Sequence, residues 1–339
     1  MANVPVDSYQ RSLQDLRISV TDRCNFRCTY CMPLDQYDWI ARDQILTYEE
    51  IHRLARIFVS LGVRKIRITG GEPLLRKDLG ELVAMVASID GVEDLCLTTN
   101  GSRLQGMAKD LRRRGLRRVT VSVDSIRPDT FAKMAQRGHI ETVLSGIEAA
   151  KDAGLAPIKL NTVVERGVND QEILELLDFA VSKGIEIRFI EYMDVGNVNH
   201  WTSQKLVSKP QILERIGAEH AFEPVPGRGS APSVRYRLKG AKGAFGVIAS
   251  VTEPFCGACT RARLTADGRF VTCLFSTHGH DLKSMLRSGA DDTWIRDSIS
   301  SVWTARTDRY SEQRLEAISS AEGYNPLAVQ KLEMISLGG

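Results

Sequence analysis

Six short apolar runs, each followed by an amphipathic stretch, alternate along the first 191 residues of this 339-residue chain. They predict strands at 16–20, 65–69, 94–99, 117–123, 158–164 and 185–190, and helices after Thr47 and at 78–88, 104–114, 141–153 and 171–183. Thr47 and Glu50 form the pattern of a capping box, which marks a helix start. Six β-α units in series predict an α/β fold with a parallel sheet. Because a closed barrel has eight units, we predict a partial, open (βα)₆ barrel of the TIM type. A doubly wound sheet is the alternative that the pattern leaves open.

The pattern changes after residue 193. Prolines at 210, 224, 226 and 232 interrupt a mixed segment, and shorter strand-like pieces follow at 234–238, 244–250, 261–264 and 270–273. Helical patterns lie near 282–287 and 294–305. We therefore predict two domains. Residues 1–232 form the barrel, and residues 233–339 form a smaller α+β region that covers its mouth.

Charge and hydropathy exclude several classes of partner. The chain has 45 basic and 42 acidic residues, a net charge of +3, so no global field requires a nucleic acid. No apolar stretch approaches the ~20 residues of a membrane helix, and residues 1–19 lack an export signal. We expect a cytoplasmic protein with no membrane partner, as a monomer or a homodimer.

The seven cysteines form two triplets and one remainder. An odd count without an export signal argues against a disulfide framework. Cys96 lies in an apolar run and is expected to be a small core residue. The triplets are Cys24, Cys28 and Cys31, and Cys256, Cys259 and Cys273. Three thiolates can hold a [4Fe–4S] cluster and leave one iron open. Structural zinc is the alternative, most clearly for the second triplet, where His278 would complete a Cys₃His site.

The first triplet carries a recognisable motif. Cys24-Asn-Phe-Arg-Cys28-Thr-Tyr30-Cys31 resembles the signature of radical S-adenosylmethionine (SAM) enzymes, whose open iron binds the amino and carboxylate groups of SAM. The resemblance implies SAM contacts from residues at the ends of several predicted strands: Tyr30, Gly71, Glu72, Ser122, Asp124 and Met193. A plain turn at Gly70-Gly71-Glu72-Pro73, and helix caps at Ser122 and Asp124, are the simpler alternatives.

From residue 16 to the terminal Gly338-Gly339, and above all at residues 256–275, the chain resembles the GTP 3′,8-cyclase family of molybdenum cofactor biosynthesis. The resemblance implies two [4Fe–4S] clusters, SAM, and a lyase that converts GTP to (8S)-3′,8-cyclo-7,8-dihydro-GTP. An external one-electron donor and the downstream cyclic pyranopterin monophosphate synthase are the implied partners. The implied GTP contacts are Arg17, Arg67, Thr98, Lys159, Arg261, Ala262 and Arg263.

Strand alternation agrees with a basic barrel interior. Arg67 and Thr69 share one strand face, and Lys159 and Asn161 share another. A surface ion pair explains each basic residue singly, whereas a triphosphate explains several converging together. Two rival functions are a radical SAM maturase acting on a peptide and a zinc-binding protein without activity.

The chain end allows two interpretations. The Gly338-Gly339 pair is either a frayed tail or a narrow segment that enters the active site. By resemblance, we predict that the tail assists the first step of catalysis together with the first cysteine triplet.

Overall fold

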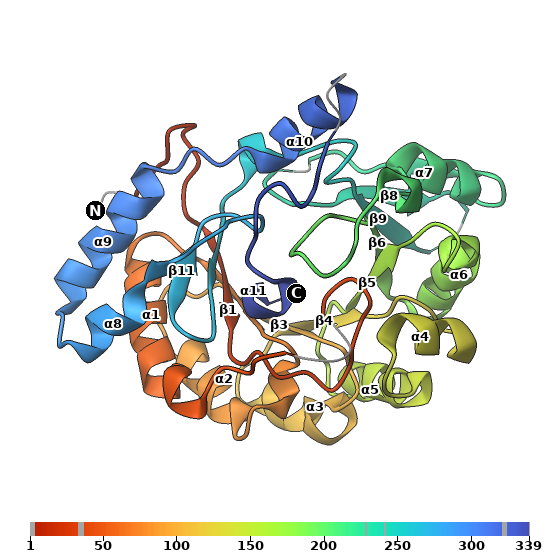
Figure 1. Cartoon of the computed structure of the whole chain (residues 1–339). Coiled ribbons are helices and arrows are strands. Elements are labelled where there is room, and N and C mark those ends of the chain that lie inside the picture. The colour runs from red at the N-terminus through yellow and green to blue at the C-terminus, as the bar shows by residue number, and fades with distance from the viewer. Residues whose placement is uncertain (1–3, 33–36, 228, 241, 321–323, 339) are drawn as a thin grey trace.

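The computed structural model describes residues 4–32, 37–227, 229–240, 242–320 and 324–338. Their strands form one twelve-stranded sheet in the order β12-β11-β10-β1-β2-β3-β4-β5-β6-β9-β8-β7. The strands from β10 to β9 in this order are all parallel. Figure 1 shows that they form a curved wall with α1 to α6 on its outer side and α11 near its centre. This is an open barrel and not a doubly wound sheet.

The first six strands occupy the predicted positions. They are β1 (Asp15–Ser19), β2 (Lys65–Thr69), β3 (Asp94–Thr99), β4 (Arg118–Ser122), β5 (Lys159–Val164) and β6 (Glu186–Glu191). The outer helices are α1 (Tyr48–Ser60), α2 (Leu79–Ala87), α3 (Leu104–Arg113), α4 (Pro128–Ala135), α5 (Ile140–Asp152) and α6 (Ile173–Lys183). The main apolar core lies between these two layers. Cys96 is fully buried, as predicted, but it lies in register with Arg67 and is not part of this core cluster.

Helix α1 shows how local sequence sets an element. The Glu50 amide donates to Thr47 Oγ1 at 3.1 Å, and the Thr47 amide donates to Glu50 Oε2 at 2.8 Å. The predicted capping box is therefore complete. Ile51, Leu54 and Phe58 are fully buried on the face that packs against the sheet. Helix propensity, the N-terminal cap and the buried apolar face all favour a helix at these residues.

The C-terminal half extends both edges of the same sheet. Its strands are β7 (Phe222–Pro224), β8 (Val234–Leu238), β9 (Ala244–Ile248), β10 (Arg261–Leu264), β11 (Arg269–Val271) and β12 (His280–Asp281). Strand β9 pairs in parallel with β6, and β10 pairs in parallel with β1. The region predicted as a second domain thus contributes two strands to the parallel wall, besides segments over the mouth. The boundary at residue 232 stays a prediction.

The remaining helices are α7 (Lys209–Gly217), α8 (Leu282–Arg287), α9 (Asp292–Thr304), α10 (Tyr310–Ser319) and α11 (Met334–Leu337). The sequence pattern did not indicate α7, α10 or α11, nor α4 on the barrel. Pro210 suggested a break, but it lies in the first turn of α7, where its missing amide costs nothing. Helix α10 was missed because its buried residues, Ser311 and Arg314, are polar.

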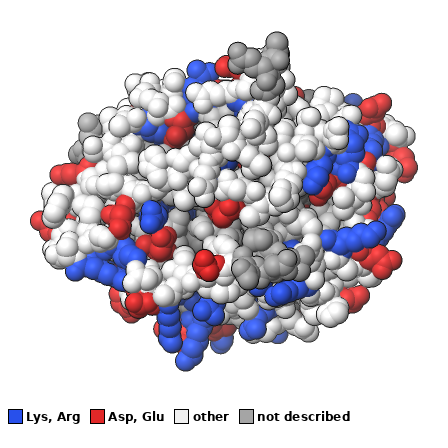
Figure 2. Space-filling model, in the orientation of Figure 1, with Lys and Arg blue, Asp and Glu red and all other residues white. Residues whose placement is uncertain are grey.

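The surface around the barrel mouth carries both signs of charge. Figure 2 shows Lys and Arg interspersed with Asp and Glu around a largely uncharged centre, in line with the small net charge. Within the described ranges, no helix is both long enough and apolar enough to cross a membrane.

Candidate active site

A cavity of about 170 Å³ lies inside the strand wall and is strongly basic. Its lining includes a group that we call the arginine cluster: Arg17 from β1, Arg67 from β2, Arg188 from β6, and Arg261 and Arg263 from β10. Thr98, Asn161, Met193 and the three cysteines of the second triplet line the same space. Strand pairing brings the arginines together, because Arg17 lies in register with Arg67 on one side and with Arg263 on the other.

The arginine cluster has no carboxylate partner in the described part of the chain. No ion pair found among the described residues involves any of its five members. Burial, together with the neighbouring Arg67 and Arg261, lowers the pKa of Arg17 to about 10. Burial and Arg67 lower the pKa of Arg188 to about 9. Both groups stay cationic at neutral pH, so the cavity is suited to an anion of high charge.

Free polar atoms point to the same conclusion. Arg67 Nη1 donates to Thr98 Oγ1 at 3.0 Å and Thr120 Oγ1 at 3.2 Å, and Arg188 Nη2 donates to Thr120 Oγ1 at 3.2 Å. Within the described part of the chain, Arg17 Nε, Arg188 Nε and Asn161 Oδ1 are buried without a hydrogen-bond partner. An unpaired buried donor is costly, and a ligand that accepts from it would remove that cost.

Two predicted GTP contacts lie outside the cavity lining. Lys159 begins β5, and its Nζ donates to Glu186 Oε1 at 2.9 Å. The Ala262 side chain points to the opposite face of β10 from Arg261 and Arg263 and is part of the apolar core. The structure therefore places five predicted residues around the cavity: Arg17, Arg67, Thr98, Arg261 and Arg263.

Arg188, Asn161 and Arg306 line the cavity but were not predicted as ligands. Arg188 had a readable signal. It lies in register with Asn161 on the neighbouring strand, so the alternation rule that placed Asn161 towards the interior applies to it as well. Arg306 follows α9 and had no such signal.

The second cysteine triplet faces the cavity directly. Arg261 Nη2 donates to Cys259 Sγ at 3.3 Å. Burial alone would raise the pKa of Cys259, but Arg261 and Arg306 outweigh it and lower the pKa to about 6. A thiolate is the form that binds iron, so Cys259 is suited to this role, whereas burial raises the pKa of Cys273 to about 12. Because all three cysteines line one cavity, they still supply the ligand set of an iron–sulfur cluster. His278 hydrogen-bonds to Thr277 and lines an outer groove that also contacts Cys273. Across the described ranges, no three His, Cys, Asp or Glu side chains are close enough to hold a single metal ion.

The first triplet lies in the loop after β1, at the carboxyl end of the wall. The loop after β2 packs tightly on it. A Cβ at Gly71 would lie 2.4 Å from the Arg23 carbonyl oxygen, so only glycine fits there. The side-chain Nδ2 of Asn100 lies 4.0 Å from Cys24 Sγ, and the backbone amide of Asn100 donates to Glu72 Oε2 at 2.7 Å. Glu72 thus links the Gly-Gly-Glu-Pro loop to the cysteine loop through Asn100. The three thiols interact electrostatically with one another, so they lie close together, and such a set also fits a cluster.

The other predicted SAM contacts surround the same end of the barrel. Tyr30 donates to Asp124 Oδ2 at 2.7 Å, which ties the cysteine loop to the end of β4. Burial raises the pKa of Asp124 to about 6 despite this bond. Ser122 ends β4 and lies in register with Asn161. Met193 follows β6 and lines the cavity.

The chain end reaches into the barrel. Arg263 Nη1 donates to the carbonyl oxygens of Leu337 at 2.9 Å and Gly338 at 3.2 Å. Gly338 has φ +74°, and a Cβ there would lie 2.3 Å from Thr69 Cγ2. The chain up to Gly338 is therefore packed between strands and is not a frayed end. Gly339 lies outside the described residues.

Comparison with known proteins defines the class. Residues 18–180 match the model of the radical SAM superfamily, and residues 185–312 match the model "Molybdenum Cofactor Synthesis C". The SAM-bound crystal structure of SuiB from Streptococcus suis superposes with a TM-score of 0.60. That match covers 97% of this chain and 73% of SuiB at 14% identity, so it shows the fold alone. The protein is a radical SAM enzyme, a class that uses SAM and an iron–sulfur cluster.

Closer relatives specify the family. A GTP 3′,8-cyclase of Acidothermus cellulolyticus is 51% identical over 319 residues, which is 91% of this chain and 88% of the relative. GTP 3′,8-cyclase 1 of Mycobacterium tuberculosis is 42% identical over 342 residues, covering 98% and 95% of the two chains. A Staphylococcus haemolyticus GTP 3′,8-cyclase is 45% identical, with 91% and 93% covered. The chain belongs to the GTP 3′,8-cyclase family.

Proposed function

We propose that this chain converts GTP to (8S)-3′,8-cyclo-7,8-dihydro-GTP, the first step of molybdenum cofactor biosynthesis. One observation carries the proposal beyond family membership. The arginine cluster, the second cysteine triplet and the chain end share one cavity at the centre of the barrel. A small, highly anionic substrate matches that cavity. SuiB has been crystallised with the precursor peptide SuiA, but the likeness to SuiB extends only to the fold, so it does not favour a peptide substrate here.

The cofactors supply the radical chemistry. Cys24, Cys28 and Cys31 would hold a [4Fe–4S] cluster that, with SAM and one electron from an external donor, supplies a 5′-deoxyadenosyl radical. Tyr30, Gly71, Glu72, Ser122, Asp124 and Met193 are the residues that we infer to hold SAM. We infer a second [4Fe–4S] cluster on Cys256, Cys259 and Cys273, beside the guanine of GTP.

The chain's own residues hold the substrate. Arg17, Arg67 and Arg188 lie on three strands and would donate to the triphosphate, using the two Nε groups that now lack partners. Arg261 and Arg263 lie on the side of the second cysteine loop and would bind GTP there, while Arg263 also holds the chain end. Thr98 and Asn161 add neutral polar groups between them. Lys159 stays a proposed contact, and its side chain would have to leave Glu186 to reach the substrate.

The reaction also requires that the bound substrate be enclosed by the protein. Cyclisation joins the ribose C3′ to C8 of guanine, and the hydrogen atom lost from C3′ is balanced by one electron and one proton returned to the product. Radical steps need a site without competing hydrogen donors and with little water. Helix α11 lies near the centre of the barrel, and Met334 at its start lines the cavity, so this turn would cover part of the bound substrate. The product would then pass to cyclic pyranopterin monophosphate synthase.

The direct test is anaerobic incubation of the cluster-loaded protein with SAM, dithionite and GTP. We expect a product with the mass of GTP but a different chromatographic retention, together with 5′-deoxyadenosine and methionine in equal amounts. Deuterium at C3′ of GTP should appear in the 5′-deoxyadenosine. Formation of 5′-deoxyadenosine without deuterium and without a GTP-derived product would contradict the proposal.

A further inference from the structure

A buried carboxylate, Asp194, gathers the C-terminal part of the chain. It follows Met193 after β6, and its side chain is 1% exposed. Asp194 Oδ2 accepts from Tyr310 Oη at 2.7 Å and from Lys331 Nζ at 2.6 Å, and it also accepts from the Tyr324 hydroxyl. Asp194 Oδ1 accepts from the Arg314 guanidinium. Lys331 Nζ also donates to the Asp194 carbonyl oxygen at 2.9 Å.

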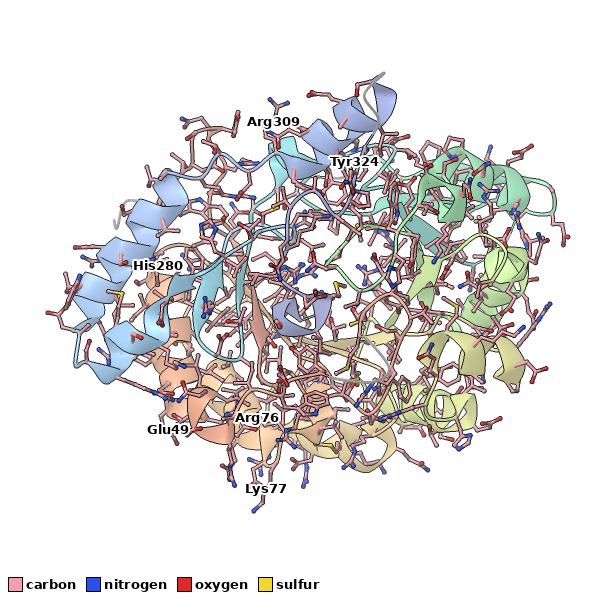
Figure 3. The ribbon with its side chains drawn as sticks, in the orientation of Figure 1. Glu49, Arg76, Lys77, His280, Arg309 and Tyr324 are labelled. Atoms are coloured by element: carbon pink, nitrogen blue, oxygen red, sulfur yellow. The ribbon has the colours of Figure 1, made fainter. Side chains whose placement is uncertain are left out.

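All of these donors come from residues 310–331, which lie in α10 or beyond it. Figure 3 shows Tyr324 beside α10, well away from the outer helices of the barrel. The side chains of Arg314 and Lys331 are 0% and 2% exposed, so two cations and one anion are buried together. A buried ion cluster of this kind is weak evidence for stability, because apolar residues would serve as well. The cluster does fix the relative positions of Asp194, Arg314 and Lys331, because a buried charge needs an opposite charge beside it.

A second joint lies next to the first. Asn197 Nδ2 donates to the Lys331 carbonyl oxygen and to Glu333 Oε1, both at 2.7 Å. The Lys331 amide donates back to Asn197 Oδ1 at 3.0 Å. A Cβ at Gly196 would lie 2.5 Å from Glu333 Oε2, so the backbone itself approaches closely there. We call residues 324–338 the C-terminal strap. Both joints fasten the strap to the loop after β6.

The strap is short between Lys331 and its end at Gly338. Six residues separate Lys331 from Gly338, and Met334–Leu337 form a helical turn, so the segment cannot extend far. Ser336 Oγ lies 3.1 Å from Tyr37 Oη, and Arg263 holds the carbonyls of Leu337 and Gly338. The position of Lys331 therefore determines how deep Gly338 reaches.

We propose that Asp194 is a positioning residue that sets the depth of the chain end in the cavity and couples it to the loop that carries Met193. The expected effect on turnover rests on the function proposed above. The expected effect on the position of the strap does not depend on that function. Asp194 itself touches neither the arginine cluster nor the cysteines, and its effect on turnover runs through the strap.

The test uses Lys331→Met, which removes the cation and keeps most of the stem, with Lys331→Arg as the conservative rescue. Asn197→Ala cuts the second joint independently. Lys209→Met is the matched control, because Lys209 is also a largely buried lysine, paired with Glu253, but lies in α7 outside the strap. All variants are studied with clusters loaded.

The first measurement is amide hydrogen exchange over residues 331–338 without GTP. We expect exchange to be roughly tenfold or more faster in Lys331→Met and Asn197→Ala, and unchanged in Lys209→Met. The second is steady-state kinetics, where kcat should fall about tenfold while KM for GTP changes by less than about threefold. The third repeats Lys331→Met in a chain lacking Gly338 and Gly339. In that shortened chain, Lys331→Met should lower kcat by less than about twofold more, because the substitution acts through the tail.

Three results would overturn the proposal. They are unchanged exchange in both joint variants, an equal loss of kcat with and without the two glycines, or the same losses in Lys209→Met. If the wild-type chain fails to cyclise GTP, the proposed function fails, whereas the exchange measurement still decides whether Asp194 and Lys331 fix the strap.

Discussion

Arg263 Nη1 lies 2.9 Å from the carbonyl oxygen of Leu337. Strand β10, which follows Cys259, therefore also holds the last turn of the chain. Positions 263 and 337 are remote in sequence, yet they share one hydrogen bond inside the barrel. Any substrate in the cavity therefore meets the arginine cluster and the chain end together.

Gly338→Ala should displace the chain end. A Cβ would lie 2.3 Å from Thr69 Cγ2, and the backbone has φ +74°. We expect cyclisation to fall at least about tenfold with cluster content unchanged, measured as product per iron. Gly184→Ala is the control, because Gly184 also has a positive φ, at +69°, but nothing lies within 4 Å of its added Cβ. Equal effects of the two substitutions would mean that backbone strain alone is responsible.

Arg67→Ala and Arg188→Ala should weaken GTP binding. Each removes a charge-assisted donor to the triphosphate, at a cost of roughly 1.5–3 kcal/mol, or about tenfold to a few hundredfold in Kd. Titration calorimetry on the cluster-loaded protein measures this directly. Arg113→Ala, at an exposed position on α3, should leave Kd unchanged. Unaltered affinity in Arg188→Ala would assign that residue a structural role.

The two cysteine triplets should have separable roles. Reconstituted protein should carry about eight iron and eight sulfide per chain if each triplet holds a [4Fe–4S] cluster. Cys24→Ser should abolish reductive cleavage of SAM, while Cys273→Ser should retain it in the absence of GTP and lose cyclisation. Cys96→Ala serves as the control for loss of a buried thiol. About four iron plus one zinc per chain would instead support a zinc site at the second triplet.

The stability of the protein should depend on the ionisation of Glu72. Burial raises the pKa of Glu72 from 4.5 to about 7, against hydrogen bonds from Asn100, Thr99 and Leu74. A raised carboxyl pKa means that the folded state binds the proton more tightly than the unfolded state. This contribution to the free energy of unfolding is therefore full below pH 4.5, falls as pH rises, and levels off above about 7.

Glu72→Gln should remove that slope, because the amide does not ionise. We expect the wild type to lose about 2.4 kcal/mol relative to Glu72→Gln between pH 5 and 7.5. Urea unfolding at several pH values measures the difference. Parallel pH profiles of the two proteins would show that Glu72 is ionised across the whole range.

The local sequence determined the elements whose signals are local. The capping box at Thr47, the alternation in the first six strands and the spacing of both cysteine triplets could all be interpreted without a fold. Residues such as Arg67 were assigned correctly to the interior, because a strand side chain has only two faces available.

Tertiary structure alone decided which distant residues meet. Strand β10 pairs with β1, which brings Arg263 beside Arg17, and no local pattern specifies a parallel partner about 250 residues away. Lys159 and Arg188 had similar sequence signals, yet Lys159 pairs with Glu186 whereas Arg188 faces the cavity. Asp194 carries no local sequence signal, because its donors come from residues 310–331. Periodicity reports how one segment faces its surroundings, but contacts between remote segments depend on the packing of the whole chain.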